Sequence, residues 1–219
     1  MQMQKAKSFV AMTGKTKASL GRLKQQSGAA KLLVLTDMTR TGDARDYIPG
    51  LPKNSIVILR DYNLPNREAY ARSLAQLCRK YAIELYIAGD IALAEKLRCG
   101  LHLRETDLAN LKTFSFRMQK KNRGLSVAVH SVAAMRKARK WQADYMLLSP
   151  LFITRSHAKQ PQLGGHKFIR LARYGKHHGG KTVLTALGGV SSKKAKELRN
   201  LQAAHKGPMA LGFIDAVKK

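Results

Sequence analysis

Acidic residues are scarce in this chain of 219 residues. Thirteen Asp and Glu side chains stand against 41 Lys and Arg, and the formal net charge is +28. Such a charge attracts polyanions, so nucleic acid or an anionic surface would bind the chain non-specifically at low salt. The basic residues are spread along the whole sequence without a nucleic-acid motif, which equally suits an enzyme that handles phosphorylated substrates.

Aromatic residues, cysteines and long apolar runs are also few. Aromatics make up 6% of the chain, and its two cysteines, Cys78 and Cys99, lie in helical patterns without CxxC spacing. We expect two buried thiols in a reducing cytosol, not a disulfide. No apolar run reaches the roughly 18 residues of a membrane span, and the N-terminus lacks a secretory signal. We therefore predict a cytoplasmic protein with no membrane partner.

The first thirty residues contain basic side chains and no acidic one. Gly14, Gly21 and Gly28 interrupt any helix there. We predict a basic N-terminal extension over residues 1–31 that is flexible or loosely docked, with tethering to a polyanion as the alternative.

Short apolar runs recur through the rest of the chain. Most are nearly continuous in apolar residues, which is typical of parallel strands covered on both faces. They span residues 32–36, 56–59, 85–88, 101–103, 125–129, 146–148, 183–187 and 209–213. Helical spacing is found over residues 66–81, 90–98, 131–142, 166–174 and 192–202, and a short helix is expected around residues 43–48.

Eight strands that alternate with helices fit either an open doubly wound sheet or a closed barrel. The number eight favours the α/β fold of a (β/α)₈ TIM barrel, formed by residues 32–219 as one domain. In the helix predicted over residues 66–81, Leu74 and Cys78 lie on the apolar face, and Arg67 is expected to face solvent.

In such a barrel the working residues follow the strands, at the carboxyl end. The polar or glycine positions there are Asp37, Arg60, Asp90, 104–107, His130, 154–157, Gly188, Gly189 and Gly212. They combine a phosphate cradle, a guanidinium, two carboxylates and an imidazole. This set predicts a phosphorylated substrate, with or without Mg²⁺.

Gly188 and Gly189 follow the seventh predicted strand. Glycines let backbone amides approach phosphate oxygens, and the next helix N-terminus adds a partial positive charge. Barrels commonly hold phosphate after this strand. The alternative is a tight turn that binds nothing.

Asp90 and Asp107 follow neighbouring strands and could share one Mg²⁺ bridged to diphosphate oxygens, although a single aspartate at such a position is more often a helix N-cap than a metal ligand. His130, at the end of the fifth strand, is a candidate general acid or base because imidazole ordinarily titrates near neutral pH. A structural role is its alternative. His102 lies inside a strand and is expected in the core.

These residues stand in a recognisable series of motifs. In chain order they are Ile-Leu-Arg60, Ala-Gly-Asp90, Gly100-Leu-His102-Leu, Val129-His130-Ser131, Ala143-Asp144-Tyr145, Ser149-Pro150-Leu-Phe-Ile-Thr154, Leu163-Gly164 and Ala186-Leu-Gly188-Gly189. Over roughly residues 32–217 the series resembles the thiamine-phosphate synthase/TenI superfamily. The resemblance implies a barrel that joins hydroxymethylpyrimidine diphosphate to thiazole phosphate and releases diphosphate.

The resemblance also implies roles for single residues. Arg60 would bind the diphosphate, Asp90 and Asp107 would hold Mg²⁺, and Gly188 with Gly189 would bind the thiazole phosphate. The remaining phosphate contacts would come from Thr154, His157, Lys159 and Gly212, with Lys159 near enough to replace the lysine that the family has at position 157. In the TenI branch, a thiazole tautomerase, the corresponding histidine is His130.

Several positions depart from the synthase pattern. Tyr62 replaces a lysine, Gly89 an asparagine, Ile58 a glutamine, Ala128 a serine and Asp215 a serine. Such losses of polar contacts could together abolish the transfer chemistry. Three hypotheses follow: a synthase-like transferase, a tautomerase that uses His130, and a degenerate barrel that binds phosphate ligands or polyanions. The sequence leaves open whether the barrel forms a homo-oligomer.

Overall fold

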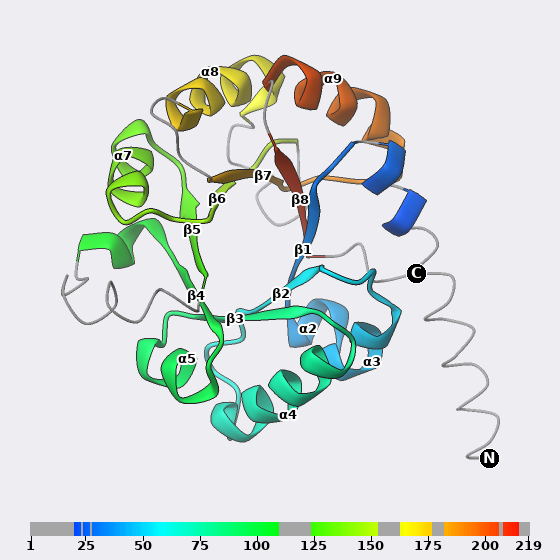
Figure 1. The fold of residues 1–219 in the computed structure, drawn as a ribbon, viewed down its shortest axis with the longest axis vertical. Coiled ribbons are helices and arrows are strands. Elements are labelled where there is room, and N and C mark those ends of the chain that lie inside the picture. Colours follow the sequence, from blue (N-terminus) through cyan, green and yellow to red (C-terminus); the bar gives the residue numbers. More distant parts are fainter. Residues whose placement is uncertain are drawn as a thin grey trace.

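Eight parallel strands close into a barrel in the computed structural model, and helices surround it (Figure 1). The structure describes residues 20–22, 24–26, 28–109, 124–152, 163–176, 182–205 and 208–214. The strands are β1 (Lys31–Leu35), β2 (Ile56–Leu59), β3 (Glu84–Ala88), β4 (Gly100–Leu103), β5 (Leu125–Val129), β6 (Tyr145–Leu148), β7 (Val183–Leu187) and β8 (Met209–Phe213). The predicted TIM barrel is confirmed.

Each strand pairs with its neighbours in the sequence, and β8 pairs with β1 to close the ring. At the closure Leu33 of β1 lies opposite Gly212 of β8, and Val34 lies opposite Phe213. Because all eight strands are parallel, their carboxyl ends meet at one end of the barrel, here called the mouth.

The two sides of each strand enter different parts of the core. Side chains that point into the barrel form one cluster, which includes Leu33, Ile58, Tyr86 and Leu147. Their sequence neighbours point outward and pack against the helices. Both faces are therefore covered, which explains why the strands are nearly continuous in apolar residues.

The helices form the outer ring of Figure 1. They are α2 (Met38–Thr41), α3 (Ala44–Tyr47), α4 (Arg67–Lys80), α5 (Ile91–Leu97), α7 (Val132–Lys140), α8 (Gly164–Lys176) and α9 (Ala195–His205), with short 3₁₀ turns η1 (Ile48–Gly50), η2 (Glu105–Ala109) and η5 (Ser192–Lys194). In α4 the buried residues are Ala71, Leu74, Ala75 and Cys78. This spacing of three and four residues gives the apolar stripe that the sequence predicts.

The predicted strands agree with the observed ones to within one residue at each end. The connection between β1 and β2 holds more structure than the expected short helix around residues 43–48. A preceding turn, α2, begins where the Asp37 carboxylate accepts a hydrogen bond from the Arg40 amide. Both cysteines are buried thiols outside any disulfide, as expected.

Residues 1–19 of the predicted basic extension (residues 1–31) lie outside the described residues. Leu20 and Ala29 are buried in the outer core, and the Arg199 guanidinium donates to the Gln26 carbonyl. The segment just before β1 therefore packs on the barrel. Within the described part of the chain no helix combines the length and apolarity needed to cross a bilayer.

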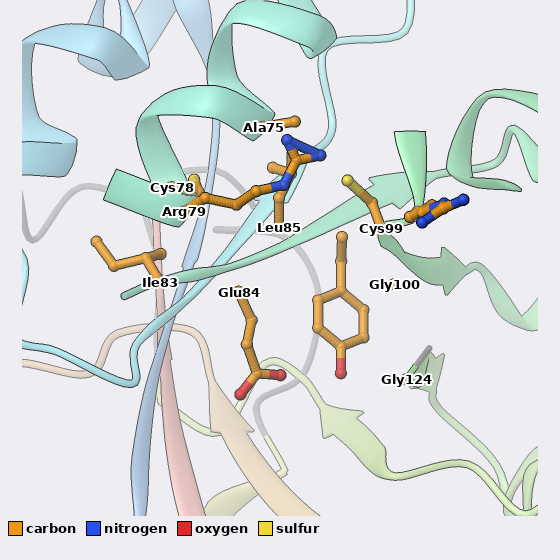
Figure 2. A pocket seen from close by; sticks show the side chains of 11 residues that line it. Ala75, Cys78, Arg79, Ile83, Glu84, Leu85, Cys99, Gly100 and Gly124 are labelled. Atoms are coloured by element: carbon orange, nitrogen blue, oxygen red, sulfur yellow. The ribbon is translucent and has the colours of Figure 1, made fainter. Parts of the chain in front are cut away.

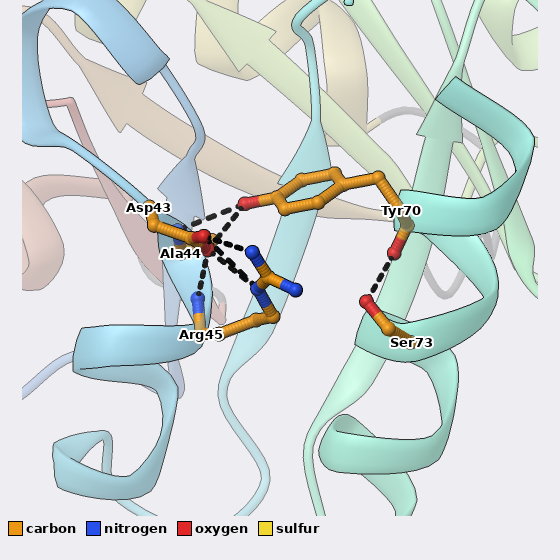
Figure 3. A network of polar contacts seen from close by, with 5 residues as sticks. All are labelled: Asp43, Ala44, Arg45, Tyr70 and Ser73. Atoms are coloured by element: carbon orange, nitrogen blue, oxygen red, sulfur yellow. Dashed lines mark hydrogen bonds and ion pairs between the residues drawn. The ribbon is translucent and has the colours of Figure 1, made fainter. Parts of the chain in front are cut away.

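A polar network joins α3 to α4 on the β1–β2 side of the barrel (Figure 3). The Tyr70 hydroxyl accepts a hydrogen bond from the Ala44 amide and donates one to Asp43, at 2.9 Å each. Asp43 caps α3 and also pairs with the Arg45 side chain. The Arg45 guanidinium holds the pKa of Asp43 below its usual value.

We expect Asp43 to make folding more stable at neutral than at acidic pH. Because the folded pKa lies below the ordinary value of 3.8, this stabilisation is complete above that value and is lost as pH falls through the folded pKa. In Asp43→Asn, the decrease of the unfolding free energy in acid should be smaller than in the wild type, as measured by urea denaturation. Asp46→Asn, on the same helix, should keep the wild-type decrease. If Asp43→Asn lost as much unfolding free energy in acid as the wild type does, the stabilising role of Asp43 would be contradicted.

Tyr86 fixes the packing of the barrel at its amino-terminal end. A Cβ at Gly100 would lie 2.5 Å from the Tyr86 ring. We expect Gly100→Ala to lower the unfolding free energy by about 1–3 kcal/mol, as overpacked cores do. Gly21→Ala is the matched control, since nothing lies within 4 Å of its added Cβ and alanine has the higher helix propensity. Equal losses in both variants would show that the contact with Tyr86 does not matter.

Candidate active site

Five of the candidate site residues at the mouth each follow a different strand. Arg60 comes after β2, Asp90 after β3, Asp107 after β4, His130 after β5 and Gly188 after β7. Each of them interacts with a residue of a neighbouring loop or of its own loop, and Arg60 and Asp107 share Tyr62 as an electrostatic neighbour. Tyr62, for example, is influenced electrostatically by Arg104, Asp107, Arg60 and Arg67.

Arg60 lies at the mouth and is held by the two residues that follow β1. Its Nη2 is 2.8 Å from Asp37 Oδ2, and its backbone amide donates to the Thr36 hydroxyl at 3.0 Å. The neighbouring Asp61 accepts hydrogen bonds from the Thr36 hydroxyl and the Met38 amide. The Arg60 side chain remains 32% exposed, so its guanidinium can reach an anion in the mouth.

Arg67 is not on the solvent side of α4, and that prediction is wrong. Its side chain is only 13% exposed. Its Nε donates to the Asp61 carbonyl at 3.0 Å, and its Nη2 donates to the carbonyls of Leu59 and Ala88 at 3.3 and 2.8 Å. The guanidinium thus caps the ends of β2 and β3, a use that helical periodicity cannot reveal.

Asp90 and Asp107, the two predicted metal ligands, each face an arginine. Asp90 caps α5 by accepting from the Leu93 amide at 2.9 Å, and its Oδ2 is 3.6 Å from Arg67 Nη1. Asp107 accepts from the Arg104 amide and from its Nε and Nη2. Burial alone would raise the pKa of Asp107, but the hydrogen bonds from Arg104 outweigh it and lower that pKa.

His130 is oriented by two neighbouring loops. Its backbone amide donates to Glu105 Oε2 at 2.7 Å, while Glu105 Oε1 accepts from the Ser131 hydroxyl at 2.6 Å. Its Nδ1 lies 3.1 Å from the Ser149 carbonyl. A carbonyl can only accept, so the proton of the neutral ring belongs on Nδ1, and Nε2 keeps its lone pair.

His102 is a core residue, as predicted. Its ring is buried, with Nδ1 3.0 Å from the Ser126 hydroxyl. Burial lowers the pKa of His102 to about 4, so the ring is neutral at physiological pH.

Gly188 and Gly189 form a turn that suits glycine. Their φ angles are 93° and 67°, a left-handed conformation that side chains disfavour. The Gly188 carbonyl accepts from the Phe152 amide at 3.1 Å. Gly212 differs, because it lies inside β8 and a Cβ there would be 2.9 Å from Leu187 Cδ1. Its lack of a side chain is needed for packing in the barrel.

A cavity of about 190 Å³ lies far from these groups (Figure 2). Glu84, Gly100 and Gly124 line it, at the amino-terminal ends of β3, β4 and β5. It therefore opens at the opposite end of the barrel from the mouth. The functional candidates are at the mouth.

Comparison with known proteins agrees with the fold and the motifs. A family model described as thiamine monophosphate synthase matches residues 48–206. The chain belongs to the thiamine-phosphate synthase/TenI superfamily. It is 33% identical over 153 residues to the thiamine-phosphate synthase of Syntrophomonas wolfei, covering 68% of this chain and 70% of the relative. The enzyme of Staphylococcus saprophyticus is 27% identical over 154 residues, covering 70% and 68%.

Solved structures support the same fold. Thiamine phosphate pyrophosphorylase from Pyrococcus furiosus matches with a TM-score of 0.60 at 19% identity, over 84% of this chain and 85% of that one. A citrate synthase matches with a TM-score of 0.56 at 10% identity, over 89% and 90%. At these identities the likeness concerns the barrel alone.

The structure shows where four of the residues that depart from the synthase/TenI pattern lie. Ile58 belongs to the cluster inside the barrel and lies opposite Tyr86 of β3, while Ala128 lies opposite Leu147 of β6, another member of that cluster. They make the floor of the mouth apolar where the family pattern has polar side chains. Tyr62 is 41% exposed, and its ring lies 3.0 Å from the position of a Cβ on Gly89. The tyrosine and the glycine therefore fit each other.

The synthase/TenI resemblance implies Mg²⁺ at Asp90 and Asp107, and the arrangement of these side chains does not fit a metal. Arg67 is fixed beside Asp90 by three backbone carbonyls. A divalent cation about 5 Å from it would be repelled by about 7 kcal/mol at an effective dielectric constant of about 20, which offsets part of the attraction of the Asp90 carboxylate for that cation.

Some predicted site residues of this synthase/TenI chain fall outside the described part. These are Thr154, His157, Lys159 and Asp215. Arg67 and Glu105 have no role assigned from the sequence, yet both orient groups at the mouth. Glu105 lies two residues before Asp107 in η2, within positions 104–107 that the sequence places at the mouth.

Proposed function

We propose that the protein is a thiamine-phosphate synthase-like transferase. It would join hydroxymethylpyrimidine diphosphate to thiazole phosphate and release diphosphate, as part of thiamine biosynthesis. The relatives carry this activity in their names, and the motifs of this chain follow theirs. Its partners would be small phosphorylated heterocycles, and its location the cytoplasm.

The observation that carries the proposal is a pair of anion-binding positions on one rim. Arg60 offers a guanidinium after β2, and Gly188 with Gly189 offers a left-handed turn after β7. Two phosphorylated substrates need two such positions. As the carbon–oxygen bond to diphosphate breaks and the bond to the thiazole ring forms, negative charge builds on the leaving group. A guanidinium at Arg60 stabilises that charge.

The transferase is tested by incubating the purified chain with both substrates and measuring thiamine phosphate and diphosphate. We expect Arg60→Ala to lower kcat/KM by about 100-fold, because the leaving group loses its cation. Arg136→Ala is the control, an exposed arginine of α7, and should keep wild-type kinetics. If the wild type forms no thiamine phosphate, the transferase is ruled out.

One observation favours a second function, a thiazole tautomerase. His130 Nδ1 faces a carbonyl, which leaves Nε2 as a base on a side chain that is exposed at the mouth. Moving a proton on a thiazole phosphate needs one such base and a phosphate anchor. It needs neither the diphosphate contacts nor the polar groups lost at Ile58 and Ala128.

If the protein is a tautomerase, His130→Gln should slow isomerisation of the thiazole phosphate by about 100-fold, since general base catalysis is lost. The reaction is followed by NMR in the presence of EDTA. His166→Gln, an exposed histidine of α8, should react like the wild type. Equal rates for the wild type and His130→Gln would exclude this role. Absence of both activities, together with RNA binding that weakens steeply with salt, would identify a polyanion-binding barrel.

A further inference from the structure

We propose that the mouth binds diphosphate without Mg²⁺, through the guanidinium groups of Arg60 and Arg104 beside Tyr62. The inference rests on the proposed function only for the identity of the anion. It follows from the way in which arginines already hold both carboxylates that would ligate a metal.

The first step concerns Asp90. The Arg67 guanidinium beside it donates to the ends of β2 and β3 and is nearly buried. Turning it away would leave the carbonyls of Leu59, Asp61 and Ala88 without this donor, which is costly in a partly buried place. The charge of Asp90 is therefore balanced by a cation that stays in position.

The second step concerns Arg104. The backbone amide, Nε and Nη2 of Arg104 all donate to the Asp107 carboxylate. The Arg104 side chain is nevertheless 60% exposed. An exposed ion pair of this kind contributes little to stability, so the guanidinium can exchange its carboxylate for a phosphate. A planar guanidinium matches two phosphate oxygens at once, and that geometry favours the exchange.

The third step concerns Tyr62, which stands where the family pattern has a lysine. Its ring centroid is 5.3 Å from the Arg104 guanidinium carbon and 5.7 Å from that of Arg67. Cation–π contacts at these distances are attractive and orient the guanidinium groups. Since Gly89 has no side chain, the ring can lie against Gly89, the residue before Asp90. Tyr62 thus fills space near the end of β3 and supports Arg104 there.

Arg60 completes the anion site. It follows β2, two residues before Tyr62, is paired with Asp37 and is partly exposed. Arg104 follows β4, and its guanidinium lies over the Tyr62 ring. A guanidinium in the loop that carries the tyrosine and another over its ring supply the positive charge that a diphosphate would otherwise obtain from a metal.

The test is calorimetric titration of the full chain with inorganic diphosphate, once in excess EDTA and once in excess Mg²⁺. We expect binding in EDTA that is at least as tight as in Mg²⁺. Arg104→Ala should weaken the binding in EDTA by about tenfold, because one charge-assisted contact is lost. Arg136→Ala should bind like the wild type. Binding only in Mg²⁺, or none in either buffer, would overturn the inference.

A second variant distinguishes a diphosphate site that uses Mg²⁺ from one that uses arginines. Asp90→Asn keeps the oxygen that caps α5 but loses the charge that a metal needs. We expect its diphosphate affinity to equal or exceed that of the wild type, because a negative charge leaves the mouth; a loss of about tenfold or more, as expected for a metal ligand, would contradict the inference. Thiamine phosphate formation is assayed separately. If the protein binds diphosphate in EDTA but forms no thiamine phosphate, the transferase proposal alone is refuted. If the protein forms thiamine phosphate but binds diphosphate only in Mg²⁺, this inference alone is refuted.

Discussion

Closure of the strand ring by the pairing of β8 with β1 is the constraint on which the site depends. The ladder joins Leu33 to Gly212 and Val34 to Phe213, residues from opposite ends of the chain. Because the strands are parallel, closure brings every strand end to one rim. Without it, Arg60 after β2 and the Gly188–Gly189 turn after β7 would have no common opening.

Carboxylates at that rim hold the loops in place, in a chain that has only thirteen acidic residues. Five of them follow strands at the mouth, namely Asp37, Asp61, Asp90, Glu105 and Asp107. Each one accepts hydrogen bonds from an arginine side chain, a hydroxyl or a backbone amide. The carboxylates therefore organise the loops and orient cations. This use of carboxylates separates the mouth from a metal centre, in which they would point their oxygens at one ion.

Strand positions were predictable because a buried parallel strand leaves a run of apolar residues that local sequence shows directly. The runs at residues 56–59, 125–129, 183–187 and 209–213 agree with β2, β5, β7 and β8 at both ends. Arg67 was misplaced for the opposite reason. Its partners are carbonyls of Leu59, Asp61 and Ala88, and a helical pattern carries no information about backbone groups from other strands. The positions of Thr154, His157 and Lys159 stay predictions.

The sequence by itself determined the alternation of strands and helices, the family motifs and the residues that follow each strand, since these depend on local periodicity and residue type. Only the tertiary structure decided which charges neutralise one another. The pairs Asp37–Arg60 and Asp90–Arg67 join residues more than twenty positions apart, and attraction between charges depends on distance in space. The same holds for Tyr62 and Gly89, whose fit arises only when β2 and β3 lie side by side.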